Sequence, residues 1–251
     1  SMLGSESDHP HELEILGAES DCSYLDGRKS LMRYRIAMTL SAERYEFLLE
    51  RGWRRFGRTM FRPECRACSE CQSLRVDINN FKPSRSQRKA RNRNSDIQLI
   101  VQPPTVSDEH IDLYNAYHLD MHERRNWPYR QIDVPQYHES FIEGEFSFSR
   151  EFQYRRNNKL VALGIVDMTG SVMSSIYFFH APEYRENALG TMSVLREIET
   201  GQQSGHQWLY MGYYISECGS MNYKNRFEPH EILDEYVTDD LPAVWNDPKP
   251  A

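Results

Sequence analysis

One segment of this 251-residue chain concentrates positive charge at helical spacing. Residues 83–94 read PSRSQRKARNRN, and on a helix Arg85, Arg88 and Lys89 share one face. Cations packed this closely repel one another unless phosphates lie between them, so we interpret the face as a grip for an RNA backbone. The cations assigned to this grip are Arg85, Arg88, Lys89, Arg91 and Arg93. A solvated helix face without a ligand is the alternative.

The charge of the whole chain hides this segment, because the formal net charge is −7. Between residues 51 and 93, thirteen basic residues stand against three acidic ones. A chain polarised in this way has one cationic face that can hold a polyanion. Trp53 and Phe56 lie among the arginines, and aromatic rings between cations are typical of nucleic-acid binding.

Three cysteines follow the pattern C-x-x-C-x-x-C, and a fourth lies in a distant segment. Thiolates at this spacing can surround one ion, and four of them would complete a tetrahedral zinc or iron–sulfur site. The candidate ligands are Cys22, Cys65, Cys68 and Cys71. Reduced thiols in a tight turn are the alternative.

The compartment follows from what the sequence lacks. No run of about 18 apolar residues occurs, and residues 1–14 are polar and acidic, unlike a secretion signal. We therefore expect a cytoplasmic protein without membrane contact. In a reducing compartment structural disulfides are uncommon, which leaves the five cysteines as thiols or metal ligands.

A second candidate site lies in residues 182–199, which follow an apolar strand pattern. A strand, a loop and a helix N-terminus resemble the acyl-CoA cradle of the acetyltransferase superfamily, where backbone N–H groups bind pyrophosphate. The cradle residues would be Arg185, Gly190 and Thr191. The second glycine of the R-x-x-G-x-G/A pattern is missing, which argues against coenzyme A and favours a different donor.

A third cluster of polar groups gathers after the strand pattern at residues 208–215. Adjacent Tyr213 and Tyr214 point to opposite faces of a strand, so one of them can line a cleft while the other packs. Lys224 and Arg226 follow in a loop, from which long cations reach anionic ligands. Packing in a core is the alternative for the tyrosines.

Period-two and helical patterns predict a chain of mixed α and β structure. Serines precede three helical patterns at Ser41, Ser84 and Ser107. Strand patterns flank the cysteine segment, and residues 151–180 and 208–215 predict most of a sheet, with a helix at about 189–203 between them. Residues 238–251 are expected to form a frayed tail.

Five segments together resemble the arginyl/leucyl-tRNA-protein transferase family, and within it the short bacterial aspartate/glutamate leucyltransferases. They are GWRRFGRTMFRPEC-x-x-C-x-x-C, FKPSRSQRKARNRN, SSIYFFHAPEY, ALGTMSVLREIE and YMGYYISECGSMNYKNRFEPHE. The similarity extends over residues 22–236. It implies transfer of Leu, or of Arg in the sister group, from tRNA to a protein with N-terminal Asp or Glu, which marks that protein for degradation by the N-degron route.

The resemblance also implies the fold, which is α+β. Residues 1–100 would form an N-terminal cysteine-containing, basic α/β region, and residues 101–237 an acetyltransferase-like (GNAT) domain with a mixed sheet, followed by the tail 238–251. An aminoacyl ester is already activated, so we expect that no cofactor is required. A structural zinc ion or iron–sulfur cluster at the cysteines is a separate option.

Residue roles follow from this reaction. Donors to the ester oxygen could be the hydroxyls of Tyr177, Tyr213 or Tyr214. The cations expected to bind the acceptor carboxylate are Lys224, Arg226, Arg54 and Arg55. Asp167 or Glu197 could accept a proton, but we interpret Asp167 as a strand-end acid and Glu197 as a helix-surface acid.

Two other classes of protein stay open on the sequence. An RNA-binding module without catalysis accounts for the basic segment but leaves the tyrosines and the loop–helix motif unexplained. An acyl-CoA N-acyltransferase accounts for the loop–helix motif but not for its missing glycine.

Overall fold

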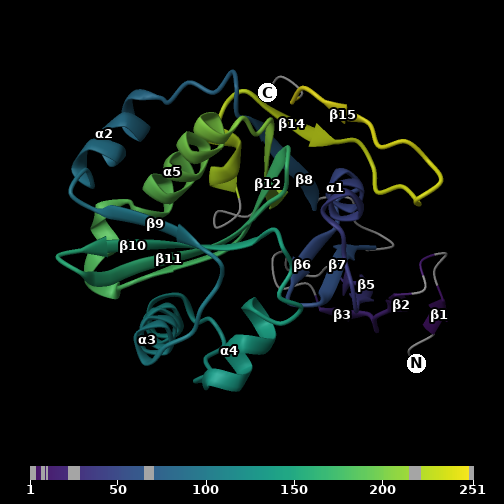
Figure 1. Ribbon diagram of the computed structural model, residues 1–251, viewed down its shortest axis with the longest axis horizontal. Helices are drawn as coiled ribbons and strands as arrows, with labels where there is room; N and C mark the ends of the chain where they lie inside the picture. The colour runs from purple at the N-terminus through teal and green to yellow at the C-terminus, as the bar shows by residue number, and fades with distance from the viewer. Residues whose placement is uncertain are drawn as a thin grey trace.

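Two antiparallel-rich sheets of different size form the body of the molecule (Figure 1). The computed structural model describes residues 4–6, 9, 11–21, 29–64, 71–214 and 222–248. The larger sheet has the order β15-β14-β8-β13-β12-β11-β10-β9 and the smaller one β1-β2-β5-β7-β6. The predicted mixed sheet is confirmed, because β12 and β13 pair in parallel while their other neighbours are antiparallel.

The strands of the larger sheet are β8 (Gln72–Asp77), β9 (Gln98–Gln102), β10 (Ser149–Arg156), β11 (Lys159–Met168), β12 (Val172–His180), β13 (Trp208–Tyr214), β14 (His230–Leu233) and β15 (Trp245–Asn246). The smaller sheet contains β1 (Gly4–Glu6), β2 (Glu12–Leu16), β5 (Met32–Ala37), β6 (Arg54–Phe56) and β7 (Thr59–Pro63). A short ribbon pairs β3 (Ser20–Asp21) with β4 (Lys29–Ser30).

The helices are α1 (Ala42–Glu50), α2 (Arg85–Arg93), α3 (Asp108–Arg125), α4 (Val134–Phe141), α5 (Leu189–Ser204) and the 3-10 helices η1 (Pro182–Asn187) and η2 (Asn222–Arg226). Three predicted starts are confirmed: the hydroxyls of Ser41, Ser84 and Ser107 accept backbone N–H groups in the first turns of α1, α2 and α3. These caps satisfy donors that a helix start otherwise leaves unpaired.

Helices cover both faces of the larger sheet. Figure 1 shows α5 and α2 on one side of β9–β11 and α3 and α4 on the other. The apolar residues of α5 join one core cluster with β8 and β10–β13, and those of α3 and α4 join a second with β11 and β12. Helix α2 packs mainly on α5, and only Gln87 and Ala90 of it are buried.

The parallel strands β12 and β13 separate after three paired positions, the last of which joins Ser174 to Tyr210. Both strands are irregular at this level. Pairing of β12 with β11 shifts between Ser175 and Tyr177, and pairing of β13 with β8 shifts between Tyr210 and Gly212, which has a φ of 84°. Bulges bend the strands apart, so backbone groups at this level have no partner in the neighbouring strand.

The larger sheet takes strands from all three predicted segments. Strand β8, from the first 100 residues, lies between β13 and β14, while β9 spans residue 100 itself. The division at residues 100 and 237 therefore stays a proposal about folding units. The expectation of a frayed tail is wrong for Trp245 and Asn246, which pair with β14, because the Trp245 indole also donates to Glu50 O at 3.0 Å and packs against Tyr210.

Within the described part of the chain, no helix combines the length and the apolar character that crossing a membrane requires.

Candidate functional site

The guanidinium of Arg54 lies where β12 and β13 separate. Its Nη2 donates to the carbonyl of Ser175 and, at 3.5 Å, to that of Ile176, two groups that β13 does not reach. A Cβ at Gly212 would collide with this guanidinium, so the glycine makes room for it. Arg54 Nη1 is buried without a hydrogen-bond partner among the described residues. Arg54 Nη1 is therefore able to donate a hydrogen bond to a ligand bound between β12 and β13.

A buried carboxylate faces the same level of β12. Glu197 on α5 is only 2% exposed, and its Oε1 has no hydrogen-bond partner among the described residues. Burial raises its pKa to about 7, while the Ser175 hydroxyl and the charge of Arg54 act to lower it. The interpretation of Glu197 as a surface acid is wrong, because α5 turns this side chain toward the sheet with Ser193 and Gly201.

Tyr177 lies on the opposite face of the sheet, toward α3. His118 Nδ1 donates to the carbonyl of Tyr114 at 2.7 Å, so its Nε2 accepts from the Tyr177 hydroxyl at 2.5 Å. Burial lowers the pKa of His118, which favours this neutral form. The Tyr177 proton is thus directed to His118, and its role as a donor to substrate stays a prediction.

The structure does not bring Tyr213 to the gap between the strands. Its hydroxyl donates to Phe61 O at 3.0 Å, in the contact between the two sheets, and burial raises its pKa well above the ordinary value. Tyr213 therefore packs, as the alternative interpretation held. The side chain of Tyr214 lies outside the described residues, so its predicted role remains a prediction.

Hydrogen bonds join helix η2 to the end of β13 and to α2. Lys224 Nζ donates to Tyr213 O at 2.9 Å, which places this ammonium at the end of β13, where the strands are apart. Arg226 is exposed, and its carbonyl accepts from Gln87 of α2 at 3.0 Å. Lys224 and Arg226, which were predicted to share one acceptor site, therefore lie in different places. Lys224 lies beside the gap between β12 and β13, and Arg226 lies beside α2.

The five predicted tRNA-binding cations all lie on α2, but their surroundings differ. Arg85, Arg88 and Lys89 are exposed, whereas Arg91 pairs with Glu199 of α5 at 2.9 Å. Arg93 is exposed and donates to Glu186 O of η1 at 2.8 Å. We define the basic surface as Arg85, Arg88, Lys89, Arg93 and Arg226.

The predicted donor loop adjoins this surface. Arg93 of α2 is fixed to η1, and η1 leads directly into α5. Ala188 begins α5 with a φ of 55° and no side chain caps the helix, while the position of a Cβ on Gly190 has no atom within 4 Å. The first turn of α5 therefore has no side-chain cap, and space for a ligand adjoins Gly190. Arg185 is engaged elsewhere, by Asp120 at 2.6 Å.

Arg55 is not available to a substrate. It is 2% exposed and donates through Nε and Nη2 to Asp167 at 3.0 and 2.5 Å. This buried pair joins β6 of the smaller sheet to β11 of the larger one. We therefore remove Arg55 from the acceptor site, and Asp167 is a partner of this arginine rather than a base.

The predicted metal site lies mostly outside the described residues, since only Cys71 of its four ligands is described. The carbonyl of Cys71 accepts from the Tyr236 hydroxyl at 2.6 Å. Over the described ranges, no cluster of three or more His, Cys, Asp or Glu could hold a metal ion. Zinc or iron–sulfur binding at the four cysteines therefore stays a prediction.

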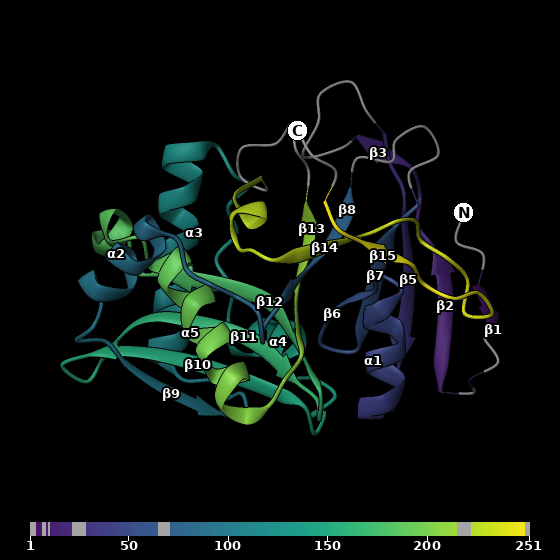
Figure 2. The same cartoon turned by 90° about the horizontal axis from the view of Figure 1, so that it is seen from above.

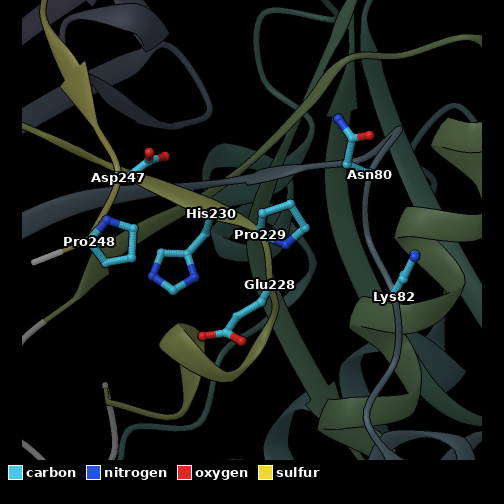
Figure 3. A pocket seen from close by; sticks show the side chains of 7 residues that line it. All are labelled: Asn80, Lys82, Glu228, Pro229, His230, Asp247 and Pro248. Atoms are coloured by element: carbon cyan, nitrogen blue, oxygen red, sulfur yellow. The ribbon is translucent and has the colours of Figure 1, made fainter. Parts of the chain in front are cut away.

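A pocket of about 540 Å³ lies elsewhere, beside β14 (Figure 3). Lys82 lines it together with the carboxylates of Glu228 and Asp247. None of the predicted site residues does so. Two carboxylates at its wall disfavour an RNA phosphate or an acidic peptide, so we do not place the reaction there.

Sequence comparison identifies relatives of this chain. It is 35% identical over 221 residues to an aspartate/glutamate leucyltransferase of Helicobacter hepaticus, covering 88% of this chain and 92% of the relative. A Campylobacter jejuni protein of the same name is 36% identical over 222 residues, covering 88% and 93%. Profiles described as arginine-tRNA-protein transferase, N terminus and C terminus, match residues 20–89 and 109–234. The chain belongs to the arginine-tRNA-protein transferase family.

Membership of the arginine-tRNA-protein transferase family makes this chain an aminoacyltransferase enzyme. A bare RNA-binding module and an acyl-CoA N-acyltransferase are therefore set aside. The structure of FemX has a similar fold, with a TM-score of 0.51 and 8% identity, covering 95% of this chain and 89% of that chain. This similarity concerns the fold alone, and it supports the expected α+β class with a mixed sheet.

Proposed function

We propose that this chain transfers leucine from leucyl-tRNA to the N-terminus of proteins that begin with Asp or Glu, a step that marks them for degradation. The names of its relatives support the leucyl donor and the acidic acceptor. In the structure, the proposal is supported by the position of the basic surface beside the gap between β12 and β13. Hydrogen bonds join this surface to η2, which is bonded to the end of β13, and to η1, which follows β12.

The basic surface would hold the tRNA. Phosphates can lie between its exposed cations, and the uncapped N-terminus of α5 adds backbone donors for one further phosphate near the aminoacyl end. Figure 2 shows α2 beside α5, and hydrogen bonds join η2 to α2 and to the end of β13. A tRNA on this surface could therefore direct its charged end toward the separated strands.

The reaction needs positioning more than a cofactor. The free N-terminal amine of the acceptor attacks the ester carbonyl, and the carbon–oxygen bond to the tRNA ribose breaks. The amine loses one proton and the departing ribose hydroxyl gains one, so leucyl ester and amine become amide and uncharged tRNA. Because an N-terminal amine has a pKa near 8, a fraction is already nucleophilic at pH 7.

The acceptor carboxylate requires a cation beside the reacting ester. Of the four predicted cations, Lys224 is the one we keep in this role, because it lies at the end of β13. Arg226 belongs to the basic surface, Arg55 is buried in an ion pair, and Arg54 lies deeper between the strands.

The proposed function is tested by a transfer assay with tRNA charged with labelled leucine or arginine. Acceptors are matched peptides that begin with Asp, Glu or Ala. We expect label from leucyl-tRNA on the Asp and Glu peptides and not on the Ala peptide. Tight binding of leucyl-tRNA without transfer to either acidic peptide would overturn the proposal, and transfer from arginyl-tRNA alone would overturn the leucyl donor.

The basic surface makes a separate prediction about salt. Replacing Arg85 and Lys89 together by Ala should weaken tRNA binding and flatten its salt dependence, by about one unit of slope for each phosphate that the variant no longer binds. Filter binding at several salt concentrations measures this slope. Arg130→Ala removes an exposed cation from the segment between α3 and α4 and should leave the slope unchanged, because Figure 1 shows both helices on the other face of the sheet from α2. An unchanged slope in the double variant would place the tRNA elsewhere.

A further inference from the structure

Two side chains of opposite charge at the gap between β12 and β13 each have one buried atom without a hydrogen-bond partner among the described residues. Glu197 Oε1 comes from α5 and Arg54 Nη1 from β6, and neither has a hydrogen-bond partner among the described residues. They do not satisfy each other, since no ion pair within 4.0 Å joins them in the described structure. A buried polar atom without a hydrogen bond is unfavourable, so such atoms are retained where a ligand completes them.

The surroundings define what kind of ligand fits. The carboxylate can accept hydrogen bonds, and the guanidinium can only donate them. Ser175, half-buried between the two elements, turns its hydroxyl to Glu197 and its carbonyl to Arg54. The charges of both groups also act on the hydroxyl of Tyr223 in η2. The site is thus complementary to a small group that carries a cation at one end and a carbonyl oxygen at the other.

An aminoacyl ester is such a group, because its free α-ammonium lies two bonds from the ester carbonyl carbon. We propose that Glu197 and Arg54 bind the aminoacyl end of the donor, with Glu197 accepting a hydrogen bond from the α-ammonium and Arg54 Nη1 donating one to the ester oxygen. This inference rests on the proposed transferase function. The site then selects charged tRNA with an unmodified α-amine. Arg54 stabilises the negative charge that develops on the carbonyl oxygen of the ester during attack.

The test compares two donors that differ only at the α-position. One is tRNA charged with leucine, and the other is tRNA charged with its α-hydroxy analogue, which has the same shape and no cation. The wild-type protein should use and bind the leucyl donor at least tenfold better. Glu197→Gln should lower kcat/KM for the leucyl donor about 100-fold, as loss of a buried charge pair does, and change the hydroxy donor by less than threefold. Glu123→Gln, an exposed carboxylate on α3, is the matched control and should change neither.

The variant Arg54→Lys tests the role proposed for Arg54. It keeps the positive charge but loses the forked donors, so kcat should fall for both donors by about 100-fold while binding of leucyl-tRNA changes little. Equal losses for the two donors in Glu197→Gln would overturn the inference and indicate a general base or a structural group. An unchanged leucyl rate in that variant would overturn it as well. Absence of transfer by the wild-type protein from either donor would instead count against the proposed function.

Discussion

Glu197→Gln should make the protein more stable at pH 8 while it disables transfer. Burial raises the pKa of this carboxyl from its ordinary 4.5 to about 7. Because each pKa unit corresponds to about 1.4 kcal/mol, the ionised carboxylate lowers the free energy of unfolding by about 3 kcal/mol. Glutamine has nearly the same shape and no charge, so the variant avoids this penalty.

The sign of the pH dependence follows from the direction of the shift. Between pH 4.5 and about 7 the folded protein holds a proton that the unfolded chain has released. Stability contributed by the neutral carboxyl is therefore present below pH 4.5 and is lost as the pH rises through 7. The charges that reach Glu197 come from Arg54 on β6, with the hydroxyls of Tyr154 and Tyr223 also coupled to it.

Urea unfolding of the two proteins at pH 5 and pH 8 measures this difference. We expect a small gain from Glu197→Gln at pH 5 and a gain of about 3 kcal/mol at pH 8. The exposed Glu123→Gln should show no such pH-dependent gain. A variant less stable than wild type at pH 8 would mean that Glu197 has a structural partner. Gain of stability with loss of activity is typical of a group kept for function.

The starts of α1, α2 and α3 were predictable because their signals are local. Ser84 caps α2 and, three residues on, Gln87 closes the capping box, all within one turn. The pattern did not show where α2 would dock, because only Gln87 and Ala90 are buried on it and α5, the helix on which α2 packs, lies about a hundred residues later. The same limit applies to β8, whose neighbours β13 and β14 are distant in the chain.

The site depends on such long-range packing. Arg54 and Arg55 are neighbours of the same type, and alternation along β6 predicts only that they point to opposite sides. Their different roles arise from the larger sheet, which offers unpaired carbonyls to Arg54 and a carboxylate to Arg55. For Glu197 a signal existed: it lies four residues from both Ser193 and Gly201, on a stripe of α5 whose members are all buried. A charged residue on that stripe indicates a functional group rather than a surface acid.

Breaking the ion pair of Arg55 with Asp167 should have the largest effect on folding. Both side chains are almost completely buried, and Arg55 also donates to Ser149 Oγ and Gly57 O at 3.1 and 2.7 Å. Asp167→Asn removes the negative charge and leaves the guanidinium uncompensated in the core. We expect a loss of about 3 to 5 kcal/mol in the free energy of unfolding, as for other buried pairs from which one partner is removed.

A control and a second variant separate this effect from general loss of charge. The pair of Lys159 with Glu183 has a similar length, 3.1 Å, but both side chains are more than half exposed. Glu183→Gln should therefore cost less than about 1 kcal/mol. The double variant Arg55→Met with Asp167→Leu should recover much of the loss, because no charge is then left buried. If Asp167→Asn costs as little as Glu183→Gln, the pair does not join the two sheets.

The functional consequence of this pair lies one residue away. Arg55 anchors β6 to β11, and Arg54 in the same short strand reaches the carbonyls of β12. The ion pair of Arg55 therefore fixes β6, and β6 in turn positions Arg54. The Met and Leu double variant keeps the core filled but removes the directional bonds of the guanidinium, so kcat should fall even where stability is restored. Full activity in that variant would show that packing alone positions Arg54.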